Sequence, residues 1–342
     1  MKGKFRIVSA LLLAALVFAG CSSSGGGSES KTLVVYSPNS EGIMNTVIPL
    51  FEEKTGIKVE VISAGTGELI KRIESEASNP YADVMFGGSY TQYMTNKALF
   101  QDYVSKENDN VIEAYRNKTG YVTYTVLDGS ALVVNTDLTK GIEISSYQDL
   151  LNPALKGKIA TADPSNSSSA FSQLTNILLA MSDDGTYTSE KAWTYVSELI
   201  KQWDGKISSG SSAVYKSVVD GEMMVGLSYE DPVAKLIKDG AKNIKIVYPS
   251  EGAVYLPAGT GIVKNAKNLD NAQAFIDFLL SEEVQNIFGS QLTNRPVRTG
   301  AKVGSYMAPF ESIHVLYEDM DYVYNHKSEI VERYTKLYAG LQ

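Results

Sequence analysis

The residues of this chain best suited to chemistry lie in the stretch 161–174, TADPSNSSSAFSQL. A short strand leads into it, and Pro164 prevents that strand from continuing as a paired central strand. The polar run 165–169 then precedes residues 170–179, whose apolar spacing predicts a helix. A helix start has unpaired N–H groups and a partial positive charge, which together favour anions. One hydroxyl is enough to cap a helix, so five polar residues favour a pocket for a phosphate or carboxylate.

Composition excludes several other kinds of site. The chain has 342 residues, 44% of them hydrophobic, which is enough for one large domain or two smaller lobes. Its net charge of −8 and the lack of a basic stripe argue against a nucleic-acid partner. With His314, His326 and Cys21 as the only histidines and cysteine, we expect no zinc site, no internal disulfide and no Cys-His or Ser-His machinery. The sequence thus predicts neither a cofactor nor a bound metal.

The elements that must position the polar stretch follow an exported leader. Residues 1–21 have a basic start, an apolar core over 7–18 and the small residues before Cys21, and they resemble a bacterial lipoprotein signal. Phe18 stands where leucine is more usual in such signals, and a plain secretory signal is the alternative. The resemblance implies lipidation at Cys21. We therefore expect a protein anchored to the extracytoplasmic face of the cell membrane by lipid only, with 22–30 as a flexible tether.

Strands and helices alternate in the first part of the chain. Strands are predicted at 31–37, 57–63 and 82–86, and helices at 43–54, 68–78 and 91–99. This alternation predicts a parallel sheet with helical crossovers, and ligands bind beyond the carboxyl ends of such strands. Residues 120–135 are β-rich and broken by Asp128-Gly129, so we interpret them as a crossover to a second lobe. A second βα pattern follows, in which a helix opens at Ser211-Ser212.

By these motifs the chain resembles the solute-binding proteins of ABC importers. The matching stretches are 33–76, ADVMFGGS at 82–89, NPALKGKIATADPSNSSSAF at 152–171, GEMMVGLSYEDP at 221–232 and the tail 272–298. Together they are similar to the two-lobed (type II) class of ferric-iron, aminoethylphosphonate and hexose-phosphate binders. The resemblance covers nearly all of 31–341.

The resemblance implies a periplasmic-binding-protein-like α/β fold, with a mixed sheet and flanking helices in each of two lobes joined by β crossovers. We expect lobe 1 over 31–125 and 253–342 and lobe 2 over 126–252, with the C-terminal helices able to contact both lobes. The implied mechanism is binding without catalysis, through hinge closure around a solute. The implied partners are a small anionic solute and an ABC permease with its ATPase, and we expect a monomer.

Three groups of residues are predicted to meet in the cleft. The hydroxyl and amide groups of both lobes suit a phosphate or phosphonate, and the carboxylates accept hydrogen bonds from sugar hydroxyls or a ligand ammonium. Each prediction has an alternative, since hydroxyls also end strands or cap helices, and acidic residues also occupy solvated turns. The predicted ligand-binding residues are Ser37, Asn39, Ser40, Thr66 and Ser89 in lobe 1; Ser167, Ser168, Ser169, Ser211 and Ser212 in lobe 2; and Tyr229, Glu230, Asp231 and Glu251 in the acidic group.

The sequence is also compatible with two other functions. Iron binders of this class commonly use adjacent tyrosines, whereas Tyr229 is followed by Glu230-Asp231. Tyr36, Tyr90 and Tyr229 are the phenolates that an iron site would use. A lipid-anchored hydrolase is the more remote alternative, because an acidic pair can act as acid and base. No nucleophile elbow, metal set or P-loop accompanies that pair.

Overall fold

The computed structural model describes residues 31–341. Its strands are β1 Thr32–Ser37, β2 Lys58–Ser63, β3 Val84–Ser89, β4 Phe100–Gln101, β5 Thr123–Asn135, β6 Ile159–Ala160, β7 Val225–Tyr229, β8 Ile244–Val247, β9 Ala253–Val263, β10 Arg295–Pro296 and β11 Val315–Leu316. Its α-helices are α1 Glu41–Thr55, α2 Thr66–Ser75, α3 Tyr90–Thr95, α4 Ser168–Ala180, α5 Glu190–Trp203, α6 Ser211–Val219, α7 Glu230–Lys238, α8 Leu269–Leu279, α9 Glu282–Ser290 and α10 Met320–Gly340.

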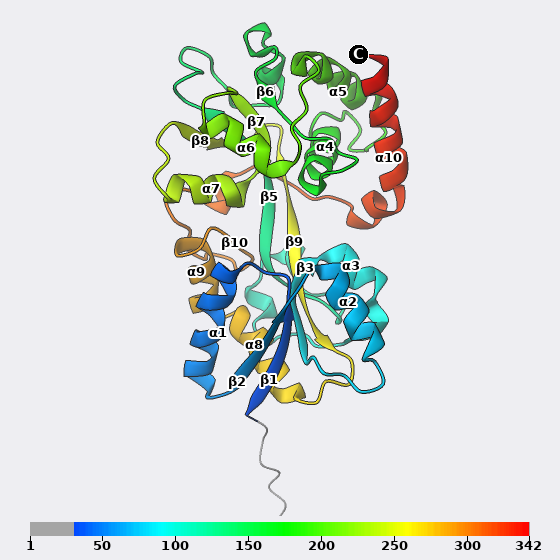
Figure 1. Cartoon of the computed structure of the whole chain (residues 1–342), viewed down its shortest axis with the longest axis vertical. Helices are drawn as coiled ribbons and strands as arrows, with labels where there is room; N and C mark the ends of the chain where they lie inside the picture. The colour runs from blue at the N-terminus through cyan, green and yellow to red at the C-terminus, as the bar shows by residue number, and fades with distance from the viewer. Residues whose placement is uncertain (1–30, 342) are drawn as a thin grey trace, which may run out of the picture. The chain divides into compact units, whose positions relative to one another are not determined.

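The strands form a mixed sheet in the order β2-β1-β3-β9-β5-β7-β6. Strands β2, β1 and β3 are parallel to one another, as the alternating pattern predicts, and β9 is antiparallel to both β3 and β5. Figure 1 shows β5 and β9 as the two long strands that run through the sheet. The first part of β5 pairs with β9, and its second part pairs with β7 and β8.

The Asp128-Gly129 pair does not break β5, contrary to the sequence-based expectation. Gly129 pairs with Tyr255 of β9. A Cβ atom built on Gly129 would lie 2.1 Å from Cε1 of Tyr255. Glycine is therefore required here because an aromatic ring packs directly on the strand, and the glycine does not mark a turn.

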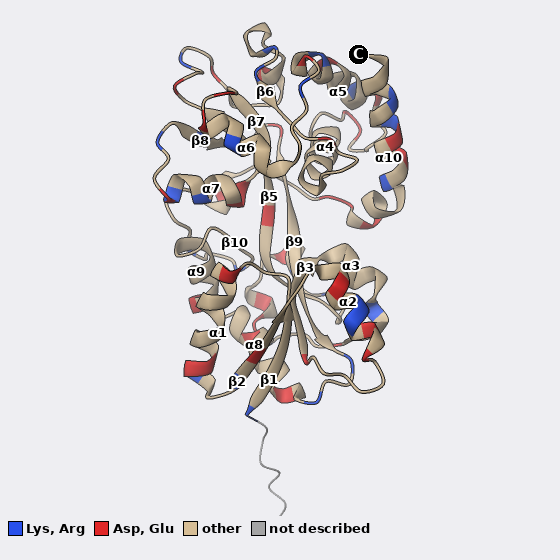
Figure 2. Ribbon diagram, in the orientation of Figure 1, with Lys and Arg blue, Asp and Glu red and all other residues tan. Residues whose placement is uncertain are grey.

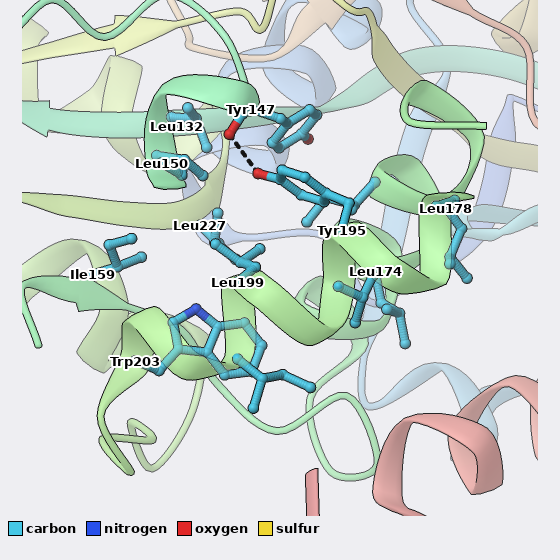
Figure 3. Packing of buried hydrophobic residues seen from close by; sticks show 14 of the residues in the cluster. Leu132, Tyr147, Leu150, Ile159, Leu174, Leu178, Tyr195, Leu199, Trp203 and Leu227 are labelled. Carbon is cyan, nitrogen blue, oxygen red and sulfur yellow. Dashed lines mark hydrogen bonds between the residues drawn. The ribbon is translucent and has the colours of Figure 1, made fainter. Parts of the chain in front are cut away.

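Helices α4 and α5 cover one part of the sheet over a large apolar cluster. Leu199, Trp203 and Leu227 are buried in it, and the hydroxyl of Tyr195 donates a hydrogen bond to the carbonyl of Tyr147 (Figure 3). The C-terminal helix α10 packs on the same cluster, where Val323, Ile330 and Tyr334 are buried. The cluster fixes the position of α4, and the serine run Ser167–Ser169 lies at the start of this helix.

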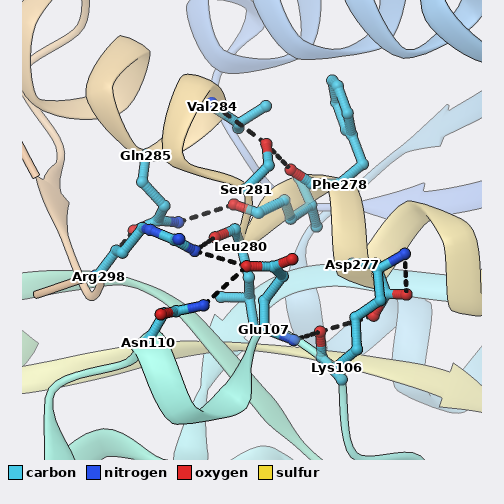
Figure 4. A network of polar contacts seen from close by, with 12 residues as sticks. Lys106, Glu107, Asn110, Asp277, Phe278, Leu280, Ser281, Val284, Gln285 and Arg298 are labelled. Carbon is cyan, nitrogen blue, oxygen red and sulfur yellow. Dashed lines mark hydrogen bonds and ion pairs between the residues drawn. The ribbon is translucent and has the colours of Figure 1, made fainter.

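A polar network joins the segment before β5 to α8 and α9 (Figure 4). Nη1 of Arg298 lies 2.8 Å from Oε2 of Glu107 and also donates to the carbonyl of Leu280. Asp277 of α8 accepts hydrogen bonds from the hydroxyls of Tyr103 and Ser105. These bonds hold residues 103–107 against α8, α9 and the segment that follows β10.

The expected signal, the lipidation site Cys21 and the tether lie outside the described residues. Over residues 31–341, we find no helix with the length and apolar character needed to cross a membrane. The lobe boundaries at 125/126 and 252/253 stay a prediction.

Candidate functional site

A cleft of about 670 Å³ lies at the carboxyl ends of the sheet strands. Residues at or just after the ends of β1, β2 and β3 form one wall, among them Asn39, Thr66 and Ser89. The opposite wall comes from the serine run and from Ser211. The cleft therefore joins polar residues that are far apart in the sequence, at the edge where open α/β sheets bind ligands.

Four helices of nine or more residues begin at the wall of this cleft, and the short α3 begins after Ser89 in the same wall. Thr66, Ser168 and Ser211 are the first residues of α2, α4 and α6, and Tyr229 directly precedes α7. Helices α2, α6 and α7 have no side-chain cap, so first-turn N–H groups remain to be satisfied by solvent or a ligand. The ends of four helix dipoles thus make the cleft favourable for a negative charge.

The serines at the start of α4 have both of the roles that the sequence left open, which are capping the helix and lining the cleft. The hydroxyl of Ser167 caps the helix by accepting a hydrogen bond from the backbone N–H of Ala170 at 3.3 Å. Ser168 and Ser169 follow it into the cleft wall, and Oγ of Ser169 is 3.3 Å from Oγ of Ser167. One serine acts as a cap, and two more hydroxyls face the same cleft.

Part of the predicted residue set lines this cleft. The lining members are Asn39, Thr66, Ser89, Ser167, Ser168, Ser169, Ser211 and Tyr229. They come from the ends of separate strands and the starts of separate helices, as the topology argument requires. Their contact with a ligand stays a prediction.

Three predicted hydroxyl residues lie elsewhere. Ser37 is fully buried, and its hydroxyl donates to the carbonyl of Phe86 at 2.7 Å, which joins β1 to β3. Ser40 lines a separate hollow beside Asp231, and Ser212 is exposed and is not part of the cleft lining. Adjacent positions differ in this way because successive residues of a helix start face different directions.

The predicted acidic group is engaged in bonds within the protein. Glu230 is 1% exposed and forms an ion pair with Arg295. Asp231 accepts a hydrogen bond from the hydroxyl of Thr293 at 2.6 Å. Glu251 accepts from the backbone N–H groups of Tyr147 and Gln148. None of the three lines the cleft, because each carboxylate instead satisfies a nearby donor.

Sequence reasoning missed Asp128 and Ser228. Asp128 is the one acidic residue of β5, visible as the red band on that strand in Figure 2, and it lines the cleft. Enclosure by the cleft walls raises the pKa of its carboxyl, as do the charges of Asp231 and Glu230. The side chain is still exposed to cleft water, which limits that increase. The only signal in the sequence was the Asp128-Gly129 pair, which resembles a turn.

Ser228 lines the cleft at the end of β7 and is 2% exposed. Its Oγ is buried and has no hydrogen-bond partner among residues 31–341. A buried hydroxyl without a partner costs free energy. A ligand oxygen or a water molecule in the cleft would remove that cost.

Among the described residues that line the cleft, Tyr229 is the one tyrosine, and none is a lysine or an arginine. Burial and the charge of Asp128 raise the pKa of Tyr229 to about 12, which disfavours a phenolate at neutral pH. Within residues 31–341 no three His, Cys, Asp or Glu side chains are grouped to hold a metal ion. The donors of the cleft are thus uncharged, and Asp128 is its charged acceptor.

Together, this mixed sheet and the cleft at its strand ends define a type II periplasmic binding protein. A family model described as bacterial extracellular solute-binding protein matches residues 47–308. The chain belongs to this family, whose members serve as the solute-binding components of ABC importers. Such proteins deliver a solute to a membrane permease and its ATPase.

Several relatives carry different ligand names. The chain is 28% identical to iron uptake protein A1 of Synechocystis, covering 82% of this chain and 80% of that one. It is 24% identical to a putative 2-aminoethylphosphonate-binding periplasmic protein of Salmonella typhimurium, covering 73% and 72%. The structure of the periplasmic binding protein AfuA from Actinobacillus pleuropneumoniae, with fructose-6-phosphate bound, superposes with a TM-score of 0.69 at 25% identity, covering 91% and 99%. These relatives are binding proteins, and they differ in the solute that their names give.

Proposed function

We propose that this protein captures a small phosphorylated or phosphonate solute, of the hexose phosphate or aminoethylphosphonate type, for import. The observation that carries the proposal is the convergence of four helix starts and several serine hydroxyls on a cleft without lysine or arginine. Backbone N–H groups and hydroxyls bind phosphate oxygens without the high hydration cost of an ammonium. Asp128 then provides an acceptor for a hydroxyl or ammonium on the rest of the solute.

The proposed mechanism is closure of two lobes, 31–125 with 253–342 and 126–252, around this solute. Donors from both walls would contact one phosphate, so the solute binds the closed form more tightly and shifts the population towards it. The protein would act as a monomer held at the extracytoplasmic face by a lipid on Cys21. The fructose-6-phosphate in AfuA and the name of the Salmonella relative support the choice of ligand class.

Ferric iron is the second candidate because Tyr229 and Asp128 both line the cleft, and the Synechocystis relative is named an iron uptake protein. A phenolate and a carboxylate are oxygen ligands suited to a hard cation. The raised pKa of Tyr229 and the lack of a second tyrosine in the lining favour the phosphate proposal.

The experiment is a thermal unfolding panel with fructose 6-phosphate, 2-aminoethylphosphonate, inorganic phosphate and ferric citrate. A ligand present at a hundred times its Kd should raise Tm by on the order of 5 °C, since it binds only the folded chain. A shift with ferric citrate alone, together with a visible tyrosinate charge-transfer band, would replace the phosphate proposal with the iron one. Free phosphate released during incubation with a phosphate ester would instead indicate a hydrolase.

A further inference from the structure

A second hollow of about 320 Å³ adjoins the cleft. The two share five lining residues, which are Ser89, Ser168, Ser172, Leu256 and Pro257. The second hollow, here called the side chamber, lies where α3, α4 and the start of α10 meet. Because the lining is shared, a solute held by the serines at the α4 start can extend into the side chamber.

The side chamber differs in chemistry from the cleft. Phe171, Met320 and Val323 give it apolar walls, and its described lining also includes the ammonium of Lys327, whose Nζ lies 4.9 Å from the centroid of the Phe171 ring. Tyr90 lines its α3 side, and its hydroxyl donates to Oδ1 of Asp321 at 3.4 Å, which joins α3 to the start of α10. The apolar walls therefore suit the carbon skeleton of a solute.

One carboxyl group, that of Glu318, lines the side chamber. Its Oε2 is buried and has no hydrogen-bond partner in the part of the chain that the structure describes. Burial, with a further contribution from the charge of Asp319, raises the pKa of Glu318 to about 7, against a lowering by Thr175. A buried carboxylate oxygen without a donor is costly, so a donor from outside the chain should be favourable there.

The distance along α4 indicates how long a solute must be to reach from the start of this helix to the far end of the side chamber. Ser168, Ser172 and Thr175 line the side chamber in succession on one face of α4. Seven residues at 1.5 Å each separate Ser168 from Thr175, a rise of about 10 Å. The three bonds from phosphorus to nitrogen in 2-aminoethylphosphonate span roughly 4 Å, comparable to one Cα–Cα step. A solute that uses both the helix starts and Glu318 is therefore longer than 2-aminoethylphosphonate.

We propose that Glu318 accepts a hydrogen bond from the far end of the solute, which makes the solute an elongated phosphate ester with a distal ammonium or hydroxyl group. This inference rests on the proposed function, because it assumes that the phosphate is bound at the helix starts. It narrows the ligand class from phosphates and phosphonates in general to esters of about hexose phosphate length, and an ammonium is the best match to the charge of Glu318.

The test is calorimetric titration at pH 8 with glucosamine 6-phosphate, glucose 6-phosphate, 2-aminoethylphosphonate and inorganic phosphate. Wild type should bind glucosamine 6-phosphate about tenfold more tightly than glucose 6-phosphate, because a bond between an ammonium and the Glu318 carboxylate replaces one between a hydroxyl and that carboxylate. Glu318→Gln keeps the shape of the side chain and should abolish that ratio. Binding of inorganic phosphate and 2-aminoethylphosphonate to this variant should be unchanged, which also shows that it is folded. The matched control is Glu329→Gln, at an exposed position of α10, which should keep the wild-type ratio.

The outcomes separate this inference from the proposed function. If wild type binds both hexose phosphates and Glu318→Gln leaves their ratio unchanged, this inference is overturned and the proposed function stands. An equal loss for all four ligands in Glu318→Gln would also overturn it, since that would indicate a structural role. If wild type binds none of the four, both proposals are rejected.

Discussion

The guanidinium of Arg295 is buried against the carboxylate of Glu230, with Nε 2.7 Å from Oε2 and both residues 1% exposed. Tyr248 donates its hydroxyl to the same carboxylate. Burial lowers the pKa of Arg295, but hydrogen bonds to Glu230 outweigh this and hold it above the ordinary value. The pair joins the start of α7 to β10, so it fixes the junction between α7 and β7, which ends at Tyr229 in the cleft wall.

Removing one partner of this pair should destabilise the fold. Arg295→Met leaves the Glu230 charge buried and unpaired, and we expect the free energy of unfolding to fall by about 3–5 kcal/mol. The double variant Arg295→Met/Glu230→Leu should recover most of that loss, since no charge is then buried. Urea unfolding monitored by circular dichroism measures both. A double variant no more stable than Arg295→Met would show that the loss does not come from an unpaired charge.

Ser211 and Ser212 provide a matched pair for testing the cleft. Ser211 lines it at the α6 start, whereas Ser212 is exposed and does not. Ser211→Ala should weaken hexose phosphate binding by tenfold or more, since a hydrogen bond to a charged group contributes about 1.5–3 kcal/mol. Ser212→Ala should bind as wild type does. Equal affinities of the two variants, measured by calorimetry, would mean that the α6 hydroxyl does not contact the solute.

Asp128 should weaken the binding of inorganic phosphate and strengthen the preference for a hexose phosphate. Its carboxylate repels a phosphate but accepts hydrogen bonds from hydroxyls of the solute. Asp128→Asn should therefore bind inorganic phosphate several-fold more tightly, while its preference for a hexose phosphate over phosphate should decrease. The two Kd values from one titration series give this ratio. An increase in the preference would place the solute hydroxyls away from Asp128.

Gly129 should not tolerate a side chain, because Tyr255 occupies the space. Gly129→Ala should lower the free energy of unfolding by about 1–3 kcal/mol through overpacking. Gly67 in α2 is the control, since a Cβ there meets no atom within 4 Å. Gly67→Ala should be neutral or stabilising by up to about 1 kcal/mol, because alanine favours a helix. Chemical denaturation of both variants would test this, and a stable Gly129→Ala would show that Tyr255 can move.

The raised pKa of Glu318 should make the stability of the fold depend on pH. Its pKa rises from 4.5 to about 7 on folding, so the folded chain binds more protons than the unfolded chain between these values. Its contribution to the free energy of unfolding therefore falls as pH rises through this window, by at most about 3 kcal/mol. The charge of Asp319 also raises the pKa of Glu318, and a hydrogen bond from Thr175 lowers it; Lys327 lines the same chamber. Glu318→Gln should be more stable than wild type at pH 8 and similar at pH 4.5. Parallel stability curves of the two proteins from pH 4.5 to 8 would contradict this.

The sequence alone determined the local elements and the class of fold. Alternating βα periodicity predicted the parallel part of the sheet, because side-chain spacing is a local property of strands and helices. It also placed Thr66, Ser89, Ser168 and Tyr229 at element ends, where the structure has them lining one cleft. The type II binding fold is confirmed by the structural comparison.

Only the tertiary structure decided the partners of the carboxylates. The three acidic residues follow strand ends, as the topology argument required, but each accepts a hydrogen bond from a donor far away in the sequence. The donors are the guanidinium of Arg295 for Glu230, the hydroxyl of Thr293 for Asp231 and the backbone N–H of Tyr147 for Glu251. Asp128 and Glu318 became visible only when β5 and the start of α10 were placed beside α4. Periodicity shows where an element ends. Which donor meets a given carboxylate depends on contacts between segments far apart in the chain, and a sequence read without its fold does not contain those distances.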